Sequence, residues 1–117
     1  MATSVGLDEN LEGALAYLLG FVTGIVFLII EKESKFVRFH AMQSTITFAG
    51  FWILSMILSY ALIPVVGFGL FFLFSGIVML INIAALITWL ICMYKAYRGE
   101  WFKLPIVGDI AEQQIRG

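Results

Sequence analysis

Charged residues are absent from the middle of this chain. Fifty-four consecutive residues, Ala41 to Tyr94, contain no Asp, Glu, Lys or Arg. As a helix with about 1.5 Å of rise per residue this stretch would measure about 80 Å, whereas the hydrocarbon core of a bilayer is about 30 Å thick. A chain of 117 residues has too little other protein to cover it in water. The pattern therefore predicts a chain that crosses a membrane, turns and crosses back.

The apolar segments predict three transmembrane helices, at about residues 11–30, 44–63 and 70–93. Glu31 and Lys32 close the first of them. Pro64 lacks an amide proton and disfavours helix at the residue before it, so we expect the second helix to end there and residues 64–69 to form the turn.

The C-terminal segment has a different pattern. Over about residues 105–116 the apolar side chains share one half of a helical wheel and the polar ones share the other. This predicts a short amphipathic helix at the membrane interface, with Pro105 in its first turn, packed on the surface of the bundle. The expected fold class is therefore all-α: one integral membrane domain, residues 1–117, of three transmembrane helices and an interfacial helix.

Basic residues predict the orientation of the chain in the membrane. All seven Lys and Arg residues lie between the first two spans or after the third, and the N-terminal tail and the 64–69 turn have none. Because basic residues concentrate on the cytoplasmic side, a three-span chain is expected to have its N-terminus outside and its C-terminus in the cytoplasm. The expected location is the cell membrane, as a multi-pass protein.

The composition excludes several kinds of partner and site. Hydrophobic residues make up 62% of the chain, charged residues 13%, and the mean hydropathy is +1.00. A net charge of −1 without a basic stripe argues against nucleic acid as a partner. The single cysteine, Cys92, rules out an internal disulfide and a multi-cysteine metal site. No nucleotide-binding, metal-binding or catalytic motif occurs, so we expect no cofactor, no metal and no enzymatic activity.

Polar residues do form one helical stripe near the start of the second span. His40, Gln43, Ser44 and Thr47 fall at i, i+3, i+4 and i+7, with Arg38 on roughly the opposite side. One interpretation makes these five residues a lining or contact surface for a headgroup, a substrate or a partner helix. The other is that they are hydrated at headgroup depth or hydrogen-bonded to neighbouring helices.

Asn82 lies near the middle of the third span, where a buried amide requires a partner. It is expected either to bond a backbone carbonyl or a hydroxyl such as Thr23 or Ser55, and so hold the bundle together, or to line a polar path.

Small residues form a ridge on the first span, at Ala16, Gly20 and Gly24. This spacing allows two helix backbones to approach closely. The ridge is expected to pack on a helix of the same chain, to form the seam of a homodimer, or to do both.

Three segments carry a family resemblance. Phe36 to Ser44, preceded by Lys35, resembles the central motif of a family of small, largely uncharacterised prokaryotic membrane proteins related to the chloroplast import component Tic twenty. Lys103 to Glu112 is similar to its second motif, and Ala16 to Gly20 fits its usual opening. The resemblance implies no catalytic residue. The plastid relative belongs to a protein-import complex and has four expected spans, in contrast to the three expected here.

The function expected from the sequence is a non-enzymatic subunit or scaffold of a membrane complex that self-associates through its first helix. The alternative is an oligomeric transport or protein-translocation component, lined by the His40 stripe and Asn82. The expected partners are the lipid bilayer and either further copies of the chain or other membrane proteins.

Overall fold

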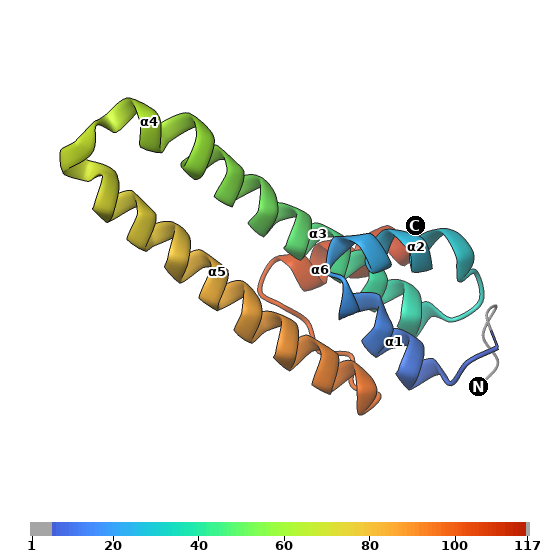
Figure 1. Ribbon diagram of the computed structural model, residues 1–117. Helices are drawn as coiled ribbons and strands as arrows, with labels where there is room; N and C mark the ends of the chain where they lie inside the picture. Colours follow the sequence, from blue (N-terminus) through green and yellow to red (C-terminus); the bar gives the residue numbers. More distant parts are fainter. Residues whose placement is uncertain (1–5, 117) are drawn as a thin grey trace.

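The computed structural model describes residues 6–116, and all regular structure within them is helical. The α-helices are α1 (Glu9–Leu18), α2 (Phe21–Ile30), α3 (Lys35–Met56), α4 (Ile63–Val66), α5 (Phe68–Tyr97) and α6 (Val107–Arg116). Helices α3 and α5 form a long hairpin joined at α4, and α1, α2 and α6 gather at the opposite end (Figure 1). We call this opposite end, with both chain termini, the base of the molecule.

Two helices of the described residues are long and apolar enough to cross a bilayer. They cover Lys35–Ala61 and Gly69–Tyr97, with mean hydropathies of 1.5 and 2.6. Most side chains of Gly69–Tyr97 are exposed in the single chain, as expected for a surface that meets lipid, whereas residues 36–47 of the other helix are largely buried in the base. The hairpin makes the molecule elongated, 56 × 25 × 21 Å. A third span is not confirmed.

The expected continuous helix over residues 11–30 is not found. The chain instead forms α1 and α2, ten residues each, which turn back on one another at Gly20 so that α2 returns to the base (Figure 1). Each measures about 15 Å, half of the hydrocarbon thickness. Gly20 has φ 63°, a backbone conformation that glycine adopts readily and other residues do not.

The carbonyl groups around the break between α1 and α2 accept hydrogen bonds from side chains, at Tyr17 and Gly20 in addition to bonds from the backbone N–H groups of Gly20 and Gly24. The hydroxyl of Thr23 donates to Ala16 (3.1 Å), the indole Nε1 of Trp89 donates to Tyr17 (2.6 Å), and the hydroxyl of Ser44 donates to Gly20 (2.9 Å). An unpaired carbonyl in an apolar environment costs several kcal/mol, on the order of a full lost hydrogen bond. These three bonds allow an apolar segment to end one helix and begin another.

The turn between the two long helices is shorter than expected, because Pro64 does not end the helix before it. Residues Ile57–Leu62 widen into a π-helix, and α4 continues through Pro64 to Val66. A wider turn moves the proline ring away from the carbonyl it would strike in an α-helix, which removes the reason for stopping. The helix ends at Gly67 instead, where φ is 84°.

The C-terminal helix is present but begins at Val107, two residues after the expected start. Pro105 lies before it, and Ile106 has φ 67°, outside the helical region. Helix α6 packs on α3, as expected for a helix on the surface of the bundle. Its buried face includes Gly108 and Ala111, whereas Ile110, expected on the apolar face, is 41% exposed.

The buried core lies in the base. One cluster joins α1, α2 and α3 through Ala16, Phe27, Phe36, Val37 and Ala41. A second joins α1 to α5 through Tyr17, Cys92 and Ala96. The base is thus a packed unit from which the α3–α5 hairpin projects.

Candidate functional site: a polar network in the base

The His40 stripe is buried in the base and centres on a residue of α1. The hydroxyl of Tyr17 lies 2.7 Å from Nδ1 of His40, and Nε2 of Gln43 lies 2.8 Å from the same hydroxyl. All three side chains are fully buried. We call these three side chains, with the backbone groups they bond between α5 and α6, the Tyr17 network.

The backbone partners fix the direction of each hydrogen bond. Nε2 of His40 lies 2.9 Å from the carbonyl oxygen of Glu100, which only accepts, so Nε2 carries the ring proton. In the neutral imidazole Nδ1 then accepts from the Tyr17 hydroxyl. The amide nitrogen of Gln43 donates to that hydroxyl and to the carbonyl of Phe102 (2.9 Å), and its oxygen accepts from the backbone N–H of Leu104 (2.9 Å).

The Tyr17 network ties three distant segments together. It joins α1, α3 and the connection between α5 and α6, across sequence separations of 23 to 61 residues. Each polar atom of His40 and the Gln43 oxygen has a protein partner. The arrangement therefore holds the base together and leaves neither imidazole nitrogen open to a substrate.

The rest of the stripe divides between two roles. Ser44 donates to the Gly20 carbonyl at the α1–α2 break. Thr47 is only 9% exposed, and its hydroxyl oxygen has no hydrogen-bond partner in the described chain. Thr47 is thus the one member of the stripe whose polar group the described protein leaves unsatisfied.

Arg38 lies on the other side of α3 and contacts the end of α2. Its Nη1 donates to the carbonyls of Leu28 (3.0 Å) and Glu31 (2.7 Å). The last carbonyls of a helix have no partners within it, and a cation is favourable there because the helix dipole is negative at that end. Arg38 therefore fastens the C-terminus of α2 to α3.

The small-residue ridge is covered by the chain itself. Ala16 is fully buried, and a Cβ on Gly24 would meet the hydroxyl of Thr45 at 2.7 Å and the carbonyl oxygen of Ala41 at 2.9 Å. A Cβ on Gly20 would lie 3.4 Å from Phe48. The ridge packs on α3, which occupies the surface that a homodimer seam would use.

Asn82 is not part of the base. It is exposed on α5, and neither expected hydroxyl bonds it: Thr23 donates to backbone carbonyls near the α1–α2 break, and the Ser55 hydroxyl has no hydrogen-bond partner among the described residues. The structure thus separates Asn82 from the His40 stripe, with which the transport alternative had grouped it.

Sequence reasoning missed several residues of the site. No local pattern singles out Tyr17 or Trp89, yet both bond across helices. Glu31 was expected only to close the first span, but it is buried and its Oε2 accepts from the backbone N–H groups of Glu33 and Ser34, at 3.0 Å each. The one local signal is Ser34, a residue type typical of an N-cap, whose side chain accepts from the Val37 N–H at the start of α3.

Comparison with known proteins defines the class to which this arrangement belongs. A UPF0132 membrane protein of Archaeoglobus fulgidus is 60% identical over 95% of this chain and 99% of its own length. UPF0132 membrane proteins of Methanocaldococcus jannaschii are 61% identical over 95% of this chain and 92% of their own length in one case, and 46% identical over 97% and 74% in another. No solved structure matches. The chain is thus one of a group of small helical membrane proteins.

Residues 3–111 match the model of the magnetosome magnetite crystal formation protein family. The chain belongs to that family. The expectation of a small membrane-protein family is therefore confirmed, whereas none of these comparisons shows a link to the chloroplast import component.

Proposed function

We propose that the protein is a non-enzymatic, self-associating subunit of a membrane assembly, and that it contacts its neighbours through α5. The observation that carries this proposal is the exposed Asn82, about halfway along a 29-residue apolar helix. An amide facing lipid lacks the hydrogen bonds it would make in water, so a partner that supplies them stabilises the assembled state.

The surface around Asn82 is suited to a helix partner. Met79 and Leu86 lie within about 60° of Asn82 on the helical wheel and are 62% and 54% exposed. An amide carries both donors and an acceptor, so two copies related by a twofold axis can pair Asn82 with Asn82. The ridge of Ala16, the seam first expected, is covered by α3, which favours α5 as the seam instead.

A structural role fits the base as well. The Tyr17 network uses its polar groups to hold helices together, which favours a rigid platform over a catalytic pocket. The family description names magnetite crystal formation, and residues 6–116 hold no group of three or more His, Cys, Asp or Glu side chains that could bind a metal ion. Our proposal for this chain is therefore the structural role alone.

The hairpin also revises the orientation that we propose. With α3 and α5 as the two spans, both termini lie at the base, on the same side of the membrane. All seven basic residues lie at the base ends of these two helices or in the segments that flank those ends. Because basic residues concentrate on the cytoplasmic side, this distribution supports a base in the cytoplasm and an α4 turn outside, in place of the N-terminus-outside arrangement expected for three spans.

Cysteine crosslinking in native membranes tests the proposed seam. Asn82→Cys in a Cys92→Ala background is expected to form a disulfide-linked dimer under mild oxidation. The matched control is Leu80→Cys in the same background, because Leu80 is 66% exposed but lies about 160° away around α5. It is expected to give little dimer.

A second measurement separates self-association from the alternatives. In gentle detergent the wild-type chain is expected to have the mass of a dimer or larger oligomer, and Asn82→Leu is expected to shift it toward monomer while the chain stays folded. A monomeric wild type, or equal crosslinking at both positions, contradicts the proposal. No specific contact favours the transport or translocation alternative, so it is not proposed.

A further inference from the structure

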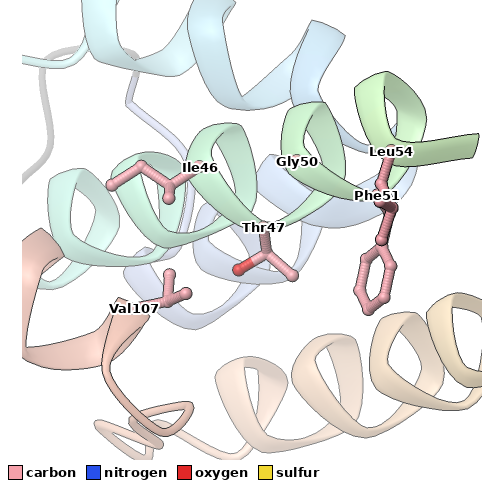
Figure 2. A pocket seen from close by; sticks show the side chains of 6 residues that line it. All are labelled: Ile46, Thr47, Gly50, Phe51, Leu54 and Val107. Carbon is pink, nitrogen blue, oxygen red and sulfur yellow. The ribbon is translucent and has the colours of Figure 1, made fainter. Parts of the chain in front are cut away.

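A groove runs along α3 on the side that faces α6. It has a volume of about 390 Å³ and is lined by Ile46, Thr47, Gly50, Phe51, Leu54 and Val107. Figure 2 shows these side chains along one stretch of α3, with Val107 at the start of α6 beside the Thr47 end and Phe51 and Leu54 at the other. Apart from the Thr47 hydroxyl, the lining side chains are hydrocarbon or, at Gly50, absent.

Thr47 supplies an unsatisfied polar group in this wall. Its side chain is 9% exposed and its hydroxyl has no hydrogen-bond partner in the described chain. The hydroxyl and the methyl group of Thr47 are nearly the same size. Rotation about the Cα–Cβ bond can therefore exchange their positions without creating a clash. In the observed position the hydroxyl oxygen is covered and unpaired, and the rotation would bring it to the groove, where a ligand oxygen can accept its proton.

Gly50 keeps the middle of the groove open. A Cβ built on Gly50 meets no atom within 4 Å. The absent side chain therefore does not serve close packing within this chain, in contrast to Gly24, where a Cβ would strike α3. A larger side chain at Gly50 would project into space that the protein leaves empty.

We propose that this groove binds one hydrocarbon chain of a membrane lipid, and that the oxygen joining that chain to glycerol accepts a hydrogen bond from Thr47. The depth is appropriate. The apolar part of α3 begins near residue 44, so Thr47 lies within about one helical turn of the hydrocarbon boundary, close to the glycerol oxygens. From Thr47 to Leu54 the groove continues about 10 Å deeper, along the direction in which a lipid chain extends.

This site is independent of the proposed α5 seam, because its lining residues belong to α3 and α6. The occupant is a lipid of the surrounding leaflet and requires no second copy of the chain. The two proposals can therefore fail separately.

Photocrosslinking in nanodiscs tests the groove. The full chain is reconstituted in phosphatidylglycerol that contains a fraction of the same lipid with a diazirine on its acyl chain, and labelled peptides are mapped after illumination. Label is expected to concentrate on the α3 segment around Phe51 and Leu54. Gly50→Leu is expected to reduce that label at least fivefold, and Thr47→Val about threefold.

Gly76→Leu is the matched control, because Gly76 lies on α5 and a Cβ there also meets no atom within 4 Å. It is expected to leave the α3 label unchanged. Thr47→Val keeps the shape of the side chain and so preserves a test even if Gly50→Leu misfolds. Label spread evenly along α3 and α5, label unchanged in Gly50→Leu and Thr47→Val, or a change of oligomer mass in Gly50→Leu that marks a second copy as the occupant would each overturn the proposal.

Discussion

The Tyr17 hydroxyl donates a hydrogen bond to Nδ1 of His40 across 2.7 Å, although 23 residues separate them in the sequence. The rings also meet edge to face, with centroids 5.4 Å apart. This contact exists because α1 ends at Leu18 and packs against α3, whereas one continuous helix over residues 11–30 was expected. It links the main departure from the sequence expectations, the split first helix, to the burial of the polar stripe.

Removing the Tyr17 hydroxyl should destabilise the base. In Tyr17→Phe, the His40 Nδ1 and one N–H of Gln43 lose their partners in a buried site, which should lower the free energy of unfolding by about 1–3 kcal/mol. Denaturant or thermal unfolding in detergent measures it. Tyr94→Phe is the control, because Tyr94 is 57% exposed, and a loss of equal size there would contradict a specific role for the network.

Arg38 should stabilise the fold through its hydrogen bonds to the end of α2 more than through its charge. Arg38→Met removes the donor to the Leu28 and Glu31 carbonyls and is expected to cost about 1.5–3 kcal/mol, the range for hydrogen bonds to charged groups. Arg98→Met removes the same charge from an exposed position and is expected to change stability by less than about 0.5 kcal/mol. Unfolding curves of the two variants in the same detergent measure these two changes in the free energy of unfolding. Similar losses would mean that net charge, not the cap on α2, is responsible.

Gly24 should tolerate no side chain. In Gly24→Ala the new Cβ meets the Ala41 carbonyl oxygen at 2.9 Å, and backbone cannot move aside as a side chain can, so we expect a loss of about 1–3 kcal/mol. Gly76→Ala adds the same atom to open space in a helix and should be neutral or stabilising by up to about 1 kcal/mol. Thermal unfolding compares them, and equal stability of the two variants would place α2 farther from α3.

Cysteine labelling should distinguish two spans from three. In a Cys92→Ala background, Val65→Cys is expected to react with an impermeant thiol reagent in intact cells, because Val65 is 78% exposed beside the outer turn. Leu7→Cys is expected to react only after the cells are opened, since the N-terminus lies at the base with the basic segments. Labelling of Leu7→Cys in intact cells would restore the three-span topology with the N-terminus outside.

The sequence alone determined that the protein is helical and belongs in a membrane. The rest of the chain is too short to cover 54 uncharged residues in water, so these residues require lipid around them. It also located α5 and the approximate extent of α6, since each is marked by composition or a periodic pattern within the segment itself.

Tertiary structure decided that the first apolar segment forms two short helices and not one long helix. Residues 11–30 have the length and hydropathy of a span, and their break depends on donors far away in the sequence: Trp89 and Ser44 bond carbonyls at the turn. The same holds for the polar stripe, whose partners Tyr17, Glu100 and Phe102 come from other segments. Hydropathy describes how a segment partitions between lipid and water. A buried polar group instead bonds whichever group the fold brings next to it, and the local sequence pattern does not identify that group.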